Sequence, residues 1–362
     1  MSSDIDTGTL DDEAIVVIDV PLAADGAATH VVGGTAVGSP STRETDESSD
    51  GSKRSLRRFV PSWRSVLAPL VGITAFLLLW AAIAPQIETG LGTLPGPVEV
   101  LEAGQGLYDD WQADRASEAQ FLEAQELRNQ ALIDAGRADE VQDFAYTGTA
   151  TFPDQVWTSL RTVGLGFLIG TLIAIPLGLL SGISPTFRAA INPLVQVMKP
   201  ISPLAWLPIV TLVVSATASE DPLLPQSFII SALVVTLCSL WPTLINTAVG
   251  AASVDKDLLN VGKVLRLNKR QQLSKLVIPS ALPYMFTGMR LTLGVGWMVL
   301  IAAEMLAQNP GLGKFVWDEF QNGSSESLSR IMFAVVVIGL IGYALDRIMS
   351  VIENFVSRNR VA

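Results

Sequence analysis

Few side chains in this sequence could carry out acid–base, nucleophilic or metal chemistry. It contains one cysteine, Cys238, inside an apolar stretch, and one histidine, His30, inside an acidic one. These counts exclude a disulfide within the chain and argue against His/Cys metal sites and against Ser-His-Asp or Cys-His catalysis. No GxxxxGK[ST] phosphate loop occurs, so we do not expect this chain to hydrolyse ATP by that route. We therefore expect a chain that is not an enzyme and has no metal site or cofactor.

One carboxyl group does lie inside an apolar stretch, that of Glu304. An acid at such a place is costly unless it is partnered, and we expect it to have a structural or gating role. The alternative is a membrane-embedded enzyme that uses Glu304 with Asp318 and Glu319 as acid–base groups. No nucleophile–base partner is visible beside them, which disfavours that alternative.

Hydroxyls, amides and indoles also interrupt the apolar stretches. Four prolines between Pro193 and Pro208, beside Ser202 and Trp206, cannot fit one regular helix through hydrocarbon. Such a broken helix either lines a solute path or is a packing irregularity. Further on, Trp241-Pro242 precedes polar residues that share one helical face, Thr243, Asn246 and Thr247. These face either a cavity or a neighbouring helix.

The composition indicates a membrane protein. Of 362 residues, 49% are hydrophobic and only 16% are charged, against about 25% charged in soluble domains; the mean hydropathy is +0.42. The net charge of −11 is unevenly distributed: residues 1–50 carry −10, residues 86–155 carry −11, and the remainder carries +10. The chain is thus a basic membrane core with two acidic attachments.

Six apolar stretches are long enough to cross a bilayer. They lie at about 66–83, 156–181, from 185 to the acids Glu220 and Asp221, 228–250, 284–306 and 331–351. Placing both termini in the cytoplasm puts the basic segments inside and the acidic segments outside, as the positive-inside rule requires. The sequence therefore predicts an all-α integral protein of the cytoplasmic (inner) membrane, with six transmembrane helices.

The remaining segments divide the chain into parts. Residues 1–52 are predicted to form a disordered acidic cytoplasmic tail. A membrane domain over 53–355, which begins with a basic cluster, and a cytoplasmic end over 356–362 follow. Residues 108–150 look like an insertion in the first outer loop, either a helical hairpin or a flexible lobe. Gly166 and Gly170 form a small-xxx-small pair in the second span, suited to a dimer seam or to packing within the chain.

Residues 251–279 form a basic amphipathic loop between the fourth and fifth spans. Asp255 and Asp257 oppose six bases, and leucines recur at helical spacing from Leu258 to Leu267. A short loop between spans needs no apolar stripe unless something packs on it. It either lies on lipid headgroups or docks into a soluble partner.

This loop resembles the coupling loop of permease subunits in bacterial ABC importers. The ending IPSALPYMFTGMR, with Pro279, Pro283, Gly288 and Arg290, is similar to that family's ending. The family's usual Glu and Gly fall on Asn260 and Arg266, so their usual roles do not carry over. The run DLLNVGKVL resembles the nitrate branch, as do ISPLAWLPIV, LWPTLINTAVG and GLGKFVWDEFQN, in that order along the chain.

The resemblance implies the type I importer fold and a permease subunit of an ATP-driven importer for a small anion, nitrate first. Its partners would be ABC ATPase subunits that bind ATP and Mg²⁺, an extracytoplasmic solute-binding protein, a second permease copy (as a homodimer) and the lipid bilayer, with no nucleic acid. An aliphatic sulfonate or taurine importer is the near alternative. A scaffold or channel subunit outside the ABC class, and an ABC exporter, are more distant ones.

The resemblance also implies roles for particular residues. The ATPase-coupling residues are expected to be Asp255, Asp257, Leu258, Leu259, Asn260, Gly262, Lys263 and Leu265. For a small anion, a path can be lined by hydroxyl, amide and indole groups without a deep charge trap; the expected residues are Ser202, Trp206, Trp241, Thr243, Asn246 and Trp297.

Overall fold

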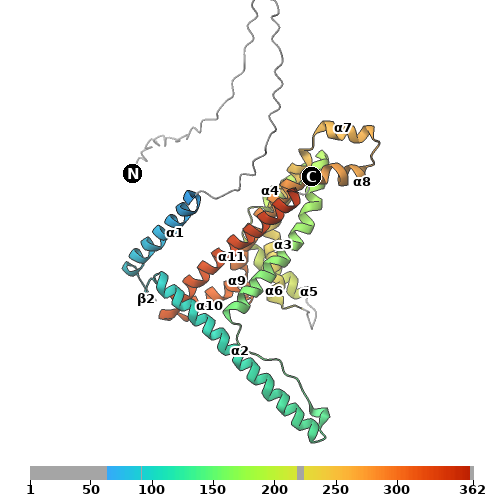
Figure 1. The fold of residues 1–362 in the computed structure, drawn as a ribbon. Coiled ribbons are helices and arrows are strands. Elements are labelled where there is room, and N and C mark those ends of the chain that lie inside the picture. The colour runs from blue at the N-terminus through green and yellow to red at the C-terminus, as the bar shows by residue number, and fades with distance from the viewer. Residues whose placement is uncertain (1–62, 91, 218–223, 359–362) are drawn as a thin grey trace, which may run out of the picture. The chain divides into compact units, whose positions relative to one another are not determined.

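The computed structural model describes residues 63–90, 92–217 and 224–358 (Figure 1). The predicted tail over 1–52, the predicted loop acids Glu220 and Asp221, most of the basic cluster before the first span and residues 359–362 lie outside the described ranges.

The described residues are almost entirely helical. The helices are α1 Trp63–Ile83, α2 Pro97–Asp134, α3 Phe152–Ile183, α4 Pro185–Met198, α5 Pro203–Thr217, α6 Gln226–Ala252, α7 Lys256–Val264, α8 Lys269–Gln272, α9 Ile278–Ala307, α10 Leu312–Asn322 and α11 Ser325–Arg358. Short 3-10 turns lie at Ala84–Gln86 and Ala138–Glu140, and a π-helical turn at Leu273–Val277 joins α8 to α9. Two two-residue strands, β1 Glu88–Thr89 and β2 Gly92–Thr93, pair antiparallel after α1.

Five helical segments in the described ranges are long and apolar enough to cross a membrane, or six if one bent pair counts as a span. The bent pair is α4 and α5, which meet at an angle of 103°. The break falls at residues 199–202, where Lys199-Pro200 and Ser202-Pro203 interrupt the helix. The predicted interruption of the third span is therefore present, and the chain is an all-α multi-pass membrane protein.

Helices α3, α6 and α9 pack side by side (Figure 1). Along α3 a small residue recurs at every fourth position, Gly166, Gly170, Ala174, Gly178 and Gly182, and all five are buried. A Cβ atom added at Gly166 would lie 2.8 Å from Val235 Cγ1, and one at Gly178 would lie 2.7 Å from the carbonyl oxygen of Leu244. The small residues thus let α3 approach α6 closely. The Gly166–Gly170 pair packs within the chain.

Helix α9 also approaches α6 closely, and it does so at Pro242 of α6. Pro242 cannot donate a backbone hydrogen bond, and the next amide, that of Thr243, donates to Thr292 Oγ1 of α9 at 3.1 Å. A Cβ at Gly288 would lie 2.8 Å from the Cα of Thr243. The seam between α6 and α9 therefore combines close backbone approach with hydrogen bonds.

The bundle has two ends that differ in composition. At one, here called the α10 end, Phe152 at the start of α3 packs edge-to-face against Phe315 of α10, with ring centroids 5.0 Å apart, and at a tilt against Phe333 of α11. At the other, the α7 end, α7 and α8 follow α6 (Figure 1), and Val277 packs with Leu179 of α3 and Ala251 of α6. Six bases lie between Lys256 and Lys275 at the α7 end.

Residues 97–150 differ from the predicted insertion. Helix α2 is one continuous helix of 38 residues that begins at Pro97 and includes the first part of the predicted insertion over 108–150. The chain then returns without regular structure along α2: the amide of Phe144 donates to Gln125 Oε1 at 2.8 Å, and Tyr146 Oη donates to Asp114 at 3.0 Å. Neither a helical hairpin nor a free lobe describes this segment.

Candidate translocation and coupling sites

Helix α7 has well-defined ends. Asp255 caps its start, because its Oδ1 accepts from the amide of Asp257 at 2.8 Å. At its other end Arg266 adopts a left-handed conformation with φ of 52°, and the amide of Leu267 donates back to the carbonyl of Gly262 at 3.0 Å. Glycine is the usual residue in this conformation, and here an arginine adopts it.

The apolar residues of α7 face two ways. Gly262 is buried, with Leu276 so near that an added Cβ would lie 2.8 Å from Leu276 Cδ1, and Leu259 packs against the cluster around Val277. Leu258 and Leu265 are exposed, as are Val261 and Val264. The single stripe suggested by leucine spacing is thus two faces, one turned to the bundle and one open. Of the remaining expected coupling residues, Asp257 and Asn260 are exposed, and Lys263 Nζ donates to Asn260 Oδ1 at 3.4 Å.

Three of the expected path residues have their polar atoms bonded between or along helices. Thr243 Oγ1 lies 2.8 Å from Thr292 Oγ1, and Asn246 Nδ2 donates to the carbonyl of Pro242 at 2.8 Å. Trp297 Nε1 donates to the carbonyl of Ile338 in α11 at 3.0 Å. Thr292 and Ile338 could not be paired with them from the sequence, because the crossing point of two helices is not a local property.

The other expected path residues lie in α5, just before it and in α6. Ser202 is exposed and its hydroxyl accepts from the amide of Leu204 at 3.3 Å, at the break before α5. The indole nitrogens of Trp206 and Trp241 are buried and have no hydrogen-bond partner among the described residues. A buried donor left unpaired costs about 1–3 kcal/mol. Both indole donors therefore lack a partner within the part of the chain that the structure describes.

Glu304 is fully buried near the end of α9 and ties three helices together. Its carboxyl group accepts from Ser159 Oγ of α3 at 2.7 Å and from the amide of Gly313, in the first turn of α10, at 3.0 Å. Ser159 Oγ in turn accepts from the amide of Leu312 at 2.9 Å. A negative group at a helix N-terminus is favourable, so Glu304 serves as the cap that α10 lacks in its own sequence. Asp318 pairs instead with Lys314, and Glu319 with Ser327 and Arg330.

Arg188 and Asn192 were not among the expected site residues. Both line a hollow between α4 and α6. Their spacing could have identified them, because Asn192 follows Arg188 by four residues and both therefore lie on one face of a helix.

Comparison with known proteins identifies the class. Residues 174–358 match the family described as binding-protein-dependent transport system inner membrane component. The chain is 32% identical over 312 residues to the bicarbonate transport system permease protein CmpB of Synechococcus elongatus, an alignment covering 86% of this chain and 96% of that protein.

Nitrate permeases are as similar to this chain as the bicarbonate permease is. The chain is 32% identical over 292 residues to the nitrate import permease protein NrtB of Synechocystis sp., covering 80% of this chain and 89% of that protein. It is 34% identical over 219 residues to NrtB of Leptolyngbya laminosa, covering 60% and 74%.

This chain belongs to the family of binding-protein-dependent transport system inner membrane components. Within it, the chain is a permease subunit with the type I ABC importer fold, in the branch that includes the nitrate and bicarbonate permeases. The family resemblance and the fold class predicted from the sequence are thereby confirmed.

Replacing Glu304 with alanine is expected to lower the thermal stability of the purified protein. The change leaves Ser159 and the Gly313 amide without their buried acceptor, at about 1–3 kcal/mol for each group. Glu304→Gln keeps an acceptor and should lie between the alanine variant and the wild type. Asp318→Ala, which breaks a partly exposed pair worth about 0–1 kcal/mol, is the control. Melting of detergent-solubilised protein measures this, and equal melting temperatures for the two alanine variants would contradict the capping role.

Proposed function

We propose that this chain moves a small monovalent oxyanion, nitrate first, across the inner membrane as the permease subunit of an ATP-driven importer. The similarity to nitrate and bicarbonate permeases supports this most directly. Nitrate and bicarbonate are both planar, carry one negative charge and present three oxygen atoms. A path suited to one has the size and hydrogen-bonding groups for the other, and nitrate is our proposal between them.

The proposed assembly contains two permease copies, two ATPase subunits and an extracytoplasmic solute-binding protein. The open apolar face of α7, with Val261 and Val264 exposed, supports an ATPase contact at the α7 end. The bases of the α7 end support a cytoplasmic position for it, and hence for both termini. ATP and Mg²⁺ bind to the ATPase subunits in this proposal, and this chain itself needs no cofactor.

The transport step is driven by the binding of the ATPase pair to the permease copies. Closure of the ATPase pair on ATP moves α7, and the two permease copies change from inward-open to outward-open. Energy enters because the closed ATPase pair binds one permease conformation more tightly than the other. On the path, the unpaired indole N–H groups of Trp206 and Trp241 donate to the anion's oxygens. Ser202 lies at the same broken span, while Thr243, Asn246 and Trp297 shape the helix seams beside it.

Deleting the gene for this chain is expected to abolish uptake of labelled nitrate and to leave sulfonate uptake unchanged. A tagged chain purified from detergent-solubilised membranes is expected to bring an ATPase with it. Loss of bicarbonate uptake with normal nitrate uptake would replace nitrate by bicarbonate as the substrate. Loss of taurine uptake alone would overturn the oxyanion proposal, and recovery without any ATPase would contradict the assembly.

Removing a single indole N–H separates a path role from a packing role. Trp206→Phe and Trp241→Phe are expected to lower uptake severalfold and to lower the melting temperature less than Trp297→Phe does, because all three lose the same ring volume but only the third breaks a hydrogen bond. Trp297→Phe breaks the bond to Ile338 and is expected to lower the melting temperature. If the first two variants lose stability and keep full uptake, Trp206 and Trp241 are packing residues.

A further inference from the structure

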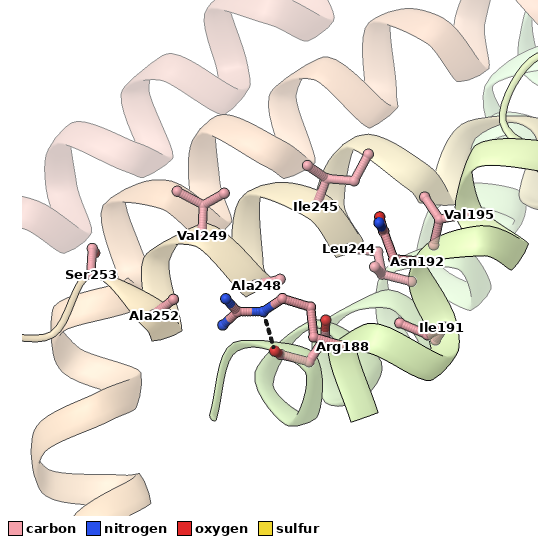
Figure 2. A pocket seen from close by; sticks show the side chains of 11 residues that line it. Arg188, Ile191, Asn192, Val195, Leu244, Ile245, Ala248, Val249, Ala252 and Ser253 are labelled. Carbon is pink, nitrogen blue, oxygen red and sulfur yellow. Dashed lines mark hydrogen bonds between the residues drawn. The ribbon is translucent and has the colours of Figure 1, made fainter. Parts of the chain in front are cut away.

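A hollow of about 470 Å³ lies at the α7 end of the bundle, between α4 and the last turns of α6 (Figure 2). We call it the Arg188 hollow. Its polar side includes Arg188 and Asn192 of α4, and its apolar wall includes Leu244, Ile245, Ala248 and Val249 of α6. A concave apolar wall with a few polar groups is the usual form of a small-ligand site.

Arg188 is held in place without its charge being neutralised. Its Nε donates to the carbonyl of Ser181 at 2.9 Å and its Nη2 to the carbonyl of Gly182 at 2.8 Å, both at the end of α3. These bonds use one edge of the guanidinium group. The structure records no ion pair for Arg188 with any described carboxylate. Arg188 and Ala248 line the same hollow (Figure 2).

Arg188 and Asn192 are both exposed at the open side of the hollow, and the charge around them is positive. Asn192 lies one helical turn further along α4 on the same face and offers amide N–H groups to the same hollow. A second hollow, of about 580 Å³, shares Arg188 and adds Lys269 and Gln272 from α8. None of the described residues that line the two hollows is acidic.

We propose that the Arg188 hollow is an oxyanion-binding site, in which the free edge of the guanidinium group holds two oxygens and Asn192 donates to the anion. Arginine suits this because its planar N–H groups match the spacing of oxygens in a planar or tetrahedral oxyanion. This proposal rests on the proposed function only in placing the site on the cytoplasmic side of the membrane. There the site holds the imported anion before release. The same chemistry binds a lipid phosphate, so the test distinguishes the two sources.

The test uses the full chain with its partners in nanodiscs, with a thiol placed in the hollow. Ala248→Cys is combined with Cys238→Ser, and the rate at which a neutral maleimide labels the introduced thiol is measured. In phosphatidylcholine nanodiscs, millimolar sodium nitrate is expected to slow labelling severalfold relative to sodium gluconate. If nitrate has no effect but phosphatidylglycerol nanodiscs slow labelling, the bound oxyanion is the phosphate of an anionic lipid.

Three variants decide whether the hollow itself binds the anion. Asn192→Asp leaves the Arg188 bonds to α3 intact and adds a negative charge. It is expected to raise the nitrate concentration needed for half-maximal protection about tenfold, as for loss of one charge-assisted hydrogen bond. Arg188→Gln removes the charge and is expected to abolish protection. Lys199→Gln removes a charge from the end of the same helix outside the hollow, and protection is expected to persist.

The proposal is overturned if neither nitrate nor the anionic lipid slows labelling, or if Asn192→Asp and Arg188→Gln are protected like the parent. Because labelling requires no transport, a failure of nitrate uptake leaves this result intact, and a failure of protection leaves the uptake result intact.

Discussion

Inside a lipid bilayer the hydrophobic effect does not drive apolar helices together, because lipid tails are as apolar as the helices. The association of α3, α6 and α9 therefore depends on close backbone contact. The stripe of small residues on α3, from Gly166 to Gly182, provides that contact with α6. Gly288 provides it between α6 and α9 at the Pro242 crossing. The positions of α4, α7 and α10 follow, because each is attached to one of these three helices.

The polar groups of the bundle complete the same arrangement. Glu304 fixes α10 against α3 and α9 at one end, and Arg188 fixes α4 against the end of α3 at the other. Both bond to helix ends, where unsatisfied backbone groups must find partners because hydrocarbon supplies none. The indoles of Trp206 and Trp241 are exceptions, since their donors have no partner in the described chain. The buried hydroxyls of Thr171, Ser231 and Thr247 are likewise without a partner among the described residues.

Local patterns in the sequence predicted much of the fold. Span lengths, the interruption between Pro193 and Pro208 and the amphipathic coupling segment are all short-range features. The features that the sequence did not predict depend on distant contacts: Phe144 and Tyr146 bond back to α2, and the leucines of α7 divide into two faces because Gly262 lies against Leu276. The partners of Thr243, Glu304 and Trp297 lie on other helices, so no spacing rule identifies them.

The central claim is that α7 carries the work of an ATPase into the bundle through its contact at Gly262, and one measurement tests it most directly. In proteoliposomes containing the whole transporter, the ratio of nitrate imported to ATP hydrolysed is compared for Gly262→Asp, Gly262→Ala and the wild type. The account predicts that Gly262→Asp continues to hydrolyse ATP while the ratio falls severalfold, because a carboxylate against Leu276 displaces α7 from the bundle. Gly262→Ala should stay coupled, since the end of the Leu276 side chain can shift. An unchanged ratio in Gly262→Asp would contradict the account.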